Sequence, residues 1–370
     1  MTQPAIVTPW EVKGNIDYNK LIKEFGIEPF HSVPEQFKEN LLFRRKKIFA
    51  HRGFNHITQA IIHKKPFVMM TGLMPTGKFH IGHMMLAKQF LLYQSFGAKI
   101  YIAVADIEAY NTRGQSLEES HKNAIEEYLI NYIALGLQPK NIDIYFQSNR
   151  SKIAKHANSY YRLQNELAHH VTFNEFKAVY GEISPGKIIS ALLQASDMLH
   201  PQIPEFEGPI PVIVPVGIDQ DPHIRLARDM SRRIKTYKFN ELCSTYHEFV
   251  PGLSGGKMSS SDPTSFVALS EDIKSVEKKI RRYAFSGGKD TIEEHRKHGG
   301  NPNIDISYQW LTFLEENDTR LKKIHDDYKS GALLSGELKT ILIEKLSDFL
   351  EQHQKKREQA RAQLANYITL

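Results

Sequence analysis

The chain lacks the features that mark secreted, membrane and cysteine-rich proteins. Its 370 residues include one cysteine, Cys243, so the chain offers neither a disulfide framework nor a cysteine-based metal site. No stretch approaches the roughly 18 apolar residues that a membrane-spanning helix needs. The first residues, Met1–Ala5, have neither the basic region nor the apolar run of a secretory signal. The sequence therefore predicts a cytoplasmic protein with no membrane partner.

A modest excess of positive charge accompanies an otherwise ordinary composition. Hydrophobic residues make up 41% and charged residues 24% of the chain, close to globular averages. The 48 Lys and Arg against 42 Asp and Glu give a net charge of +6, and such charge neutralises nucleic-acid phosphates. Many basic proteins bind no nucleic acid, so charge alone leaves the partner open. The length exceeds that of one hydrophobic core and favours about two domains.

Four short apolar runs rich in β-branched and aromatic residues predict buried strands. They are Phe67–Thr71, Ile100–Ala105, Ile142–Phe146 and Pro211–Val216. Helical stretches at Ile81–Phe96 and Ser116–Leu135 separate the first three runs. This β-α-β-α-β order predicts an α/β fold with a doubly wound, Rossmann-like parallel sheet. Ligands bind beyond the carboxyl ends of such strands, where residues 71–83, 106–110 and 217–221 would lie.

The whole chain divides into three predicted parts. Residues 1 to about 54 form an N-terminal extension, and residues 55–269 the sheet domain, with a helical insertion at about 150–207. No strand is expected after Leu269. Residues 270–370 are predicted to be all helical, with helical periodicity at Glu271–Ala284, Tyr308–Glu316, Asp318–Ser330 and Ser335–Tyr367.

The segment from Phe67 to His83 runs from a strand, through a glycine-punctuated turn, into a helix. A helix start has unpaired N–H groups and a positive dipole end, both of which attract phosphate. Gly77 and Gly82 let a nucleotide approach the backbone closely. His80 and His83, three residues apart, share one helix face and can donate to phosphate oxygens.

Three other interpretations of this segment are possible. Residues 72–78 match the Gly-x-x-x-x-Gly-Lys phosphate loop, but Phe79 replaces the Ser or Thr that would hold magnesium. A zinc site lacks both the His-Glu-x-x-His spacing and an evident third ligand. A bare His-x-x-His is most often a pair of ordinary surface histidines. A second segment decides against all three.

The second segment, Leu253–Asp262, combines a glycine entry with Lys257 and three serines. A lysine ammonium is a mobile point charge that suits a pyrophosphate leaving group, and hydroxyls add donors. Alone, such a segment is usually a solvated loop. In order with the upstream His80-Ile-Gly-His83, it resembles the Lys-Met-Ser-Lys-Ser signature that follows His-Ile-Gly-His in class I aminoacyl-tRNA synthetases.

Within that class, the chain resembles the archaeal and eukaryotic tryptophanyl-tRNA synthetase family from about Thr8 to its C-terminus. The order of several blocks carries the resemblance: Thr8–Val12, His170–Asn174, Ile218–Pro222 with Arg225 and Arg228-Asp229, and Ala284–Thr291 followed by Glu293–Arg296 and Gly299-Gly300. The resemblance implies that tryptophan's carboxylate attacks the α-phosphate of Mg·ATP. Tryptophanyl-adenylate and pyrophosphate form, and tRNA(Trp) then takes the acyl group.

The resemblance also implies the site residues. The catalytic residues are His80, His83 and Lys257, and ATP is bound by Thr76, Gly77, Gly82, Lys257, Met258, Ser259 and Ser260. Tryptophan is held by Met70, Glu108, Gln194 and Gln220, and the anticodon by Lys289 and Asp290 of the helical domain. An indole N–H only donates, so an acceptor such as Glu108 is chemically sensible. Mg²⁺ comes with ATP, no protein metal site is expected, and a homodimer is implied.

Two alternatives stay open at this stage. Tyrosyl enzymes resemble the chain at Val104–Asp106 and at Gln194–Asp197, where their aspartate reads the phenol of tyrosine. Against them, Met70 stands where their hydroxyl-reading tyrosine falls, and they lack the blocks at 219–222 and 285–291. Met70 and Ala103 also replace a tyrosine and a glutamine of eukaryotic tryptophanyl enzymes. A catalytically inactive, RNA-binding relative is the other alternative, although such proteins usually lose the signature histidines or lysine. The basic run Arg44–Lys47 would either contact phosphate or be solvated.

Overall fold

A computed structural model describes residues 6–7, 12–13, 17–256, 258 and 262–368. Within these residues the main sheet has seven strands in the order β3-β4-β9-β8-β5-β6-β7. Their bounds are Glu28–Pro29, Ile48–Arg52, Cys243–His247, Val212–Gly217, Val68–Leu73, Lys99–Val104 and Ile142–Phe146, in the same order. A separate two-stranded sheet pairs β1 (Ile6–Val7) with β2 (Val12–Lys13).

The five strands from β9 to β7 are parallel, whereas β4 pairs antiparallel with β9 and β3 with β4. The predicted doubly wound α/β fold is confirmed, and so are its four predicted strands. Strands β4 and β9 were not predicted because they are not apolar runs: His51 and Arg52 lie in one, Ser244 and Thr245 in the other. Part of the predicted N-terminal extension thus supplies two strands to the sheet.

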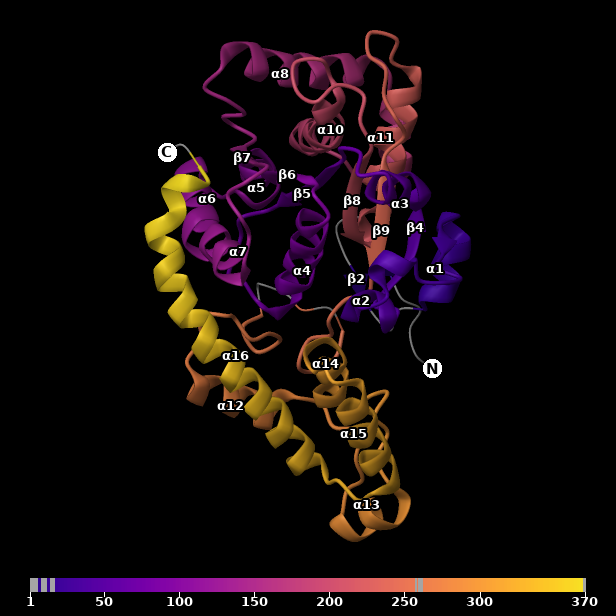
Figure 1. Cartoon of the computed structure of the whole chain (residues 1–370), viewed down its shortest axis with the longest axis vertical. Helices are drawn as coiled ribbons and strands as arrows, with labels where there is room; N and C mark the ends of the chain where they lie inside the picture. The colour runs from indigo at the N-terminus through magenta and orange to yellow at the C-terminus, as the bar shows by residue number, and fades with distance from the viewer. Residues whose placement is uncertain (1–5, 8–11, 14–16, 257, 259–261, 369–370) are drawn as a thin grey trace.

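Alternating side chains of the central strands enter two separate cores, because successive strand residues point to opposite faces. Met69 and Ile100 pack on one face with α4 (Ile81–Ser95) and α7 (Ile130–Leu135). Met70 and Tyr101 pack on the other with α8, α10 and α11, which span Ala154–His169, Pro185–Leu199 and Asp221–Arg233. Figure 1 shows the helices on both sides of the sheet.

The other helices around the sheet are shorter or lie at its ends. They are α1 (Tyr18–Phe25), α2 (Leu41–Arg44), α3 (Phe54–Ile62), α5 (Asp106–Arg113), α6 (Leu117–Asn123), α9 (Phe173–Tyr180), the π-helix η2 (Ala124–Leu129) and the 3-10 turns η1 (Glu35–Phe37), η3 (His200–Gln202) and η4 (Ile218–Gln220). None of the helices in the part of the chain that the structure describes has an apolar stretch long enough to span a bilayer.

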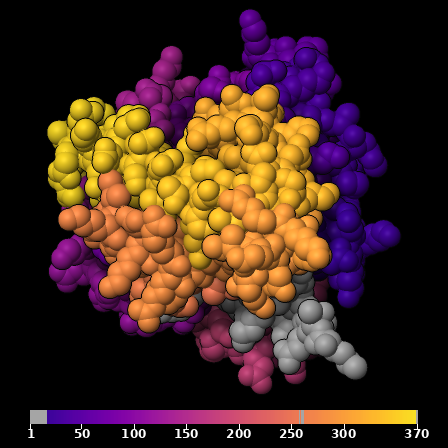
Figure 2. Space-filling view, turned by 90° about the horizontal axis from the view of Figure 1, so that it is seen from below, coloured from indigo at the N-terminus to yellow at the C-terminus, as the bar shows by residue number. Residues whose placement is uncertain are grey.

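After residue 270 the described chain is helical, as the periodicity predicts. Helices α12 (Ile273–Tyr283), α14 (Ile306–Leu314), α15 (Asp318–Ser330) and α16 (Ser335–Gln363, followed by η5 at Leu364–Asn366) match predicted segments. Helix α13 (Ile292–His298) was not predicted, since its sequence is almost wholly polar and only His295 is buried. In Figures 1 and 2 this helical part covers the lower end of the molecule, and α16 runs from it back alongside α7.

Candidate active site

The first signature segment lies at the carboxyl end of β5, where the backbone turns into α4. Gly77 has a φ of 70°, a left-handed conformation that glycine adopts without strain. The turn is held from η2, because the Tyr128 hydroxyl donates to the Thr76 carbonyl at 2.8 Å. Lys78 pairs with Glu127 on η2 rather than pointing into the turn as a phosphate-loop lysine would. The segment is therefore a fixed turn leading to a helix start.

His80 and His83 form a stacked pair at the start of α4. His80 is the N-cap, and its Nδ1 accepts from the Gly82 N–H at 3.1 Å. The His80 N–H donates in turn to His83 Nδ1 at 3.2 Å, and the ring centroids lie 3.8 Å apart. Each neutral ring then carries its proton on Nε2, as assigned from these hydrogen bonds. Nε2 is thus the atom of each ring that can donate to a phosphate oxygen.

Gly82 sits where no larger residue fits without rearrangement. A Cβ built there would lie 2.9 Å from His80 Cε1 and 3.4 Å from Met258 Sδ. Side chains from both signature segments thus lie close to the Gly82 backbone, and the approach of a nucleotide there stays a prediction. Met258, from the second segment, is buried beside Gly82.

The chain just after the second segment pairs with the first. Ile81 N–H donates to the Val267 carbonyl at 3.2 Å, and Leu269 N–H donates to the Phe79 carbonyl at 3.0 Å. These bonds bring two parts of the sequence that lie almost 190 residues apart into one backbone pairing, consistent with a shared nucleotide site. Lys257, Ser259 and Ser260, which the sequence predicts to bind ATP, lie outside the described residues.

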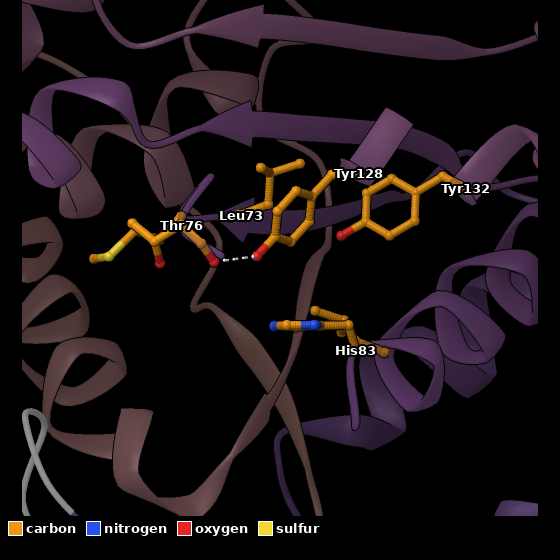
Figure 3. A pocket seen from close by; sticks show the side chains of 8 residues that line it. Leu73, Thr76, His83, Tyr128 and Tyr132 are labelled. Atoms are coloured by element: carbon orange, nitrogen blue, oxygen red, sulfur yellow. Dashed lines mark hydrogen bonds between the residues drawn. The ribbon is translucent and has the colours of Figure 1, made fainter. Parts of the chain in front are cut away.

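A cavity of about 180 Å³ opens beside the histidine pair at the end of β5. It is lined by Gly72, Leu73, Met74, Thr76, His83, Leu86, Tyr128 and Tyr132. Figure 3 shows His83 below the two tyrosine rings, with the Tyr128 hydroxyl bonded to Thr76. The cavity therefore joins Thr76, predicted to bind ATP, and His83, predicted to be catalytic, with two tyrosines that the sequence did not single out.

A second group of polar residues lies at the end of β6, around Glu108 on α5. Glu108 is 6% exposed, and the Gln194 side-chain amide on α10 donates to its Oε2 at 2.6 Å. Burial raises the pKa of Glu108 to about 7, opposed by the Gln194 hydrogen bond and reinforced by the charge of Asp197. The structure thus brings together Glu108 and Gln194, which the sequence assigns to tryptophan.

Behind Glu108 lies a buried network centred on Asp197. The Tyr145 and Tyr160 hydroxyls donate to its Oδ1 at 2.6 and 2.7 Å, and the Gln147 amide donates to its Oδ2 at 2.7 Å. Burial raises the pKa of Asp197 to about 6, although these three donors lower it. Gln147 Oε1 accepts from the Glu108 N–H at 3.4 Å, which links the two acids.

The sequence did not single out Tyr145, Gln147 or Tyr160. One signal was available, since Gln147 directly follows the predicted strand at 142–146 and so lies at the ligand-binding edge of the sheet. Nothing local marks Tyr160, because its hydroxyl meets Asp197 only through the packing of α8 on α10. The three donors also occupy the aspartate that the tyrosyl alternative assigns to a substrate phenol.

The other predicted residues occupy three different settings. Met70 is buried in β5, in the same core as Tyr145 and Tyr160. Gln220 is half-buried in η4, at the carboxyl end of β8. Lys289 and Asp290 are exposed between α12 and α13, in the helical part of the chain and apart from the sheet edge.

Three residues of the basic run at 44–47 are held in ion pairs, and Lys46 is exposed. Arg44 and Arg45 both pair with Asp318 at the start of α15, and Arg44 donates to the Glu316 carbonyl. Lys47 pairs with Glu248, just after β9, at 2.7 Å. Arg44 and Arg45 thus connect the N-terminal part of the chain to the helical part.

Taken together, a doubly wound sheet with a histidine-capped helix start at its carboxyl edge, paired with the chain just after a second, glycine-rich segment, defines a class I nucleotide-fold synthetase. A model of the family described as tRNA synthetases class I (W and Y) matches residues 63–351. The chain belongs to this family, as the two signature motifs predict.

Similar proteins point to one branch of the family. The chain is 42% identical to a tryptophan–tRNA ligase of Methanocaldococcus jannaschii, over 96% of both chains. A crystal structure of the tryptophanyl-tRNA synthetase of Aeropyrum pernix superposes with a TM-score of 0.88 at 40% identity, covering 94% of each chain. The Plasmodium falciparum enzyme gives a TM-score of 0.82 at 30% identity and 95% coverage of each. The predicted resemblance to the archaeal and eukaryotic tryptophanyl branch is confirmed.

Proposed function

We propose that the chain is a tryptophan–tRNA ligase, which activates L-tryptophan with ATP and transfers it to tRNA(Trp). The observation that carries the proposal is the joining of the two signature segments at the sheet edge, next to a buried acid suited to an indole. Whole-length similarity to tryptophan–tRNA ligases supports the same substrate and weighs against the tyrosyl alternative. Residues 55–269 are the proposed catalytic domain and residues 270–370 the anticodon-binding domain.

In activation, the tryptophan carboxylate attacks the α-phosphate and pyrophosphate leaves. The enzyme needs no covalent intermediate; it holds the reactants in line and stabilises the growing charge on the phosphates. His80 and His83 donate from Nε2, and Lys257 supplies the positive charge. Thr76, Gly77 and Gly82 let the ATP phosphates and adenosine approach the backbone, and Met258 packs beside Gly82. Ser259 and Ser260 add hydroxyl donors, and Mg²⁺ enters with the ATP.

Tryptophan is selected on the opposite side of the same edge. The indole N–H donates to Glu108, whose carboxylate accepts several donors and already receives one from Gln194. Met70 lies in the apolar wall, and a thioether packs well against an aromatic edge. Gln220, from the end of β8, faces the polar end of the amino acid.

The larger partners belong to other surfaces. Lys289 and Asp290 are exposed and suit contacts with anticodon bases and phosphates. A homodimer would cover Tyr110 on α5 and Ile189 on α10, which are 58% and 45% exposed. The two helices meet where the Asn111 amide donates to the Ser190 hydroxyl at 3.3 Å. The proposed tRNA substrate supports a cytoplasmic location. Light scattering of the purified protein, giving the mass of two chains or of one, tests the dimer.

The substrate test is ATP–pyrophosphate exchange with tryptophan or tyrosine as the only amino acid. Exchange is expected with tryptophan and to be at least 10²-fold slower with tyrosine, because the Asp197 carboxylate is already occupied by Tyr145, Tyr160 and Gln147. Preference for tyrosine would assign the chain to the tyrosyl branch. No exchange with either amino acid, in a folded protein that binds tRNA, would favour the inactive RNA-binding alternative.

A further inference from the structure

The helical domain makes two hydrogen bonds to the backbone that leads into the second signature segment. The Trp310 indole N–H, on α14, donates to the Pro251 carbonyl at 2.7 Å. The Phe285 backbone N–H donates to the Leu253 carbonyl at 2.8 Å. Pro251 and Leu253 precede Lys257 by only six and four residues. The helical domain therefore contacts the sequence just before the predicted catalytic lysine.

This stretch of backbone is tightly closed on itself. Leu253 N–H donates to the Ser265 carbonyl at 2.8 Å, and Gly252 N–H donates to the Gly256 carbonyl at 2.8 Å. A Cβ built on Gly252 would lie 3.1 Å from the Ser265 carbonyl oxygen, so residues 252 and 265 pass in close backbone contact. A shift of the Pro251–Leu253 backbone would be transmitted to Gly256 through the Gly252 hydrogen bond.

Trp310 is well placed to fix that backbone. Its side chain is fully buried in the core that α14 shares with α12 and α16. An indole N–H only donates, so its direction is set by the Pro251 carbonyl. The ring itself is held by packing, and a fully packed aromatic side chain moves little. The bond therefore ties the Pro251 backbone to a rigidly packed side chain of the helical part.

The same unit also carries the exposed segment proposed to read the anticodon. Ile306 N–H, in the first turn of α14, donates to the Phe285 carbonyl at 3.0 Å. Gly287 N–H donates to Asp305 Oδ2 at 2.9 Å, and Asp305 caps α14. Residues 285–287 and α14 thus form one hydrogen-bonded body, two residues before Lys289.

We infer that Trp310 is a positioning residue for amino-acid activation: its indole N–H holds the Pro251–Leu253 backbone that leads into the second signature segment. Trp310 is none of the residues proposed to bind a substrate, and the inference rests on the role proposed for Lys257. Because Glu108 and Gln194 lie on other elements, the loss of this hydrogen bond leaves the binding of tryptophan unchanged and slows the chemical step.

The test is Trp310→Phe, which keeps an aromatic ring and removes the N–H. In tryptophan-dependent pyrophosphate exchange, kcat is expected to fall roughly 10-fold to 10²-fold, the usual range for a misplaced catalytic group, with the KM for tryptophan within about twofold of wild type. Tyr367→Phe is the matched control, since the Tyr367 hydroxyl also donates to a backbone carbonyl, that of Leu137 at 2.7 Å. Tyr367 and Leu137 belong to neither signature segment, and this control variant is expected to leave kcat unchanged.

Two further variants decide what a slow Trp310→Phe enzyme means. In a Lys257→Ala background, Trp310→Phe is expected to cause no additional loss of kcat, because its effect acts through that lysine. Full additivity of the two losses would overturn the inference, as would an unchanged kcat in Trp310→Phe alone or an equal loss in Tyr367→Phe.

If Trp310→Phe fails to fold, Gly252→Ala tests the same backbone directly. This variant is expected to lower kcat without raising the KM for tryptophan, and an unchanged kcat would overturn the inference. Absence of tryptophan-dependent exchange in wild type would instead refute the proposed function.

Discussion

Charged side chains are used in opposite ways at the two ends of this molecule. At the sheet edge, Glu108 and Asp197 are 6% and 4% exposed, and Glu108 accepts from one side-chain donor and Asp197 from three. In the helical domain, Lys289 and Asp290 are exposed. A small substrate must be enclosed, so its polar groups are matched by buried partners. An RNA brings its own solvated phosphates and bases, so the groups that meet it stay in water until it binds.

The backbone under the exposed charges is nonetheless as tightly fixed as the buried site. Built Cβ atoms on Gly287 and Gly288 would lie 2.1 Å from the Asn301 carbonyl oxygen and 2.3 Å from the Ser335 hydroxyl. Asp305, 1% exposed, accepts from both the Gly287 N–H and the Tyr328 hydroxyl. The two regions therefore differ in the solvation of their side chains and not in the rigidity of their supports. Substitutions at each should separate activation from transfer.

The largest effect is expected at the sheet edge, from Lys257→Ala. Loss of one donor to developing charge slows adenylate formation by roughly 10²–10³-fold, while tryptophan binding stays nearly intact because Glu108 and Gln194 are untouched. Single-turnover activation and equilibrium tryptophan binding measure the two quantities. An unchanged activation rate would remove Lys257 from the catalytic residues.

Glu108→Gln should have the next largest effect and still act only on the small substrate. An amide accepts an indole proton less strongly than a carboxylate, so kcat/KM for tryptophan should fall. The fall should correspond to a loss of about 1–3 kcal/mol of transition-state stabilisation. Glu118→Gln, on the exposed surface of α6, is the matched control and should change nothing. Equal kcat/KM in the Glu108 variant and the control would take Glu108 out of the pocket.

A double substitution of Lys289 and Asp290 by alanine should have the reverse pattern. Pyrophosphate exchange should be spared, and aminoacylation should fall roughly tenfold, as expected when one phosphate and one base contact are lost. The loss should be larger with the native anticodon than with an altered one. Equal losses in exchange and aminoacylation would mean that these residues support the fold, and undiminished aminoacylation would withdraw the anticodon assignment.

The last expected effect is on the pH dependence of stability, and it too concerns the buried region. The pKa of Glu108 rises on folding from its ordinary 4.5 to about 7, mainly through burial. Between these values the folded state binds more protons than the unfolded state, so the free energy of unfolding falls as the pH rises, by at most about 1.4 kcal/mol per pH unit. Denaturant unfolding from pH 4.5 to 7 should therefore be less pH-dependent in Glu108→Gln than in wild type. Parallel curves for the two proteins would contradict a raised pKa at Glu108.

Much of the catalytic core could be predicted because its signals are local. Strands β5, β6, β7 and β8 are apolar runs. A helix start is indicated within a few residues by His80, Gly82 and His83. Strands β4 and β9 were missed because their polar residues are paired only after folding, as when Arg52 binds Asp221 from α11 at 2.8 Å. Helix α13 was missed because it buries only one residue and so has no apolar period. The domain boundaries and the individual site residues stay predictions.

The functional groups of this protein and their order along the chain follow from its amino-acid sequence. They are two histidines at a helix start, a lysine after paired glycines, and an acid beyond the second strand of the central sheet. Which of these groups are buried, and which share a hydrogen bond, depends on the folded structure. So does the hydrogen bond from Trp310 on α14 to the Pro251 carbonyl, 59 residues away. The reason is physical. A strand or helix start depends on neighbours within a few residues, whereas the pKa of Glu108 and the partners of Asp197 depend on what packs over them from distant parts of the chain.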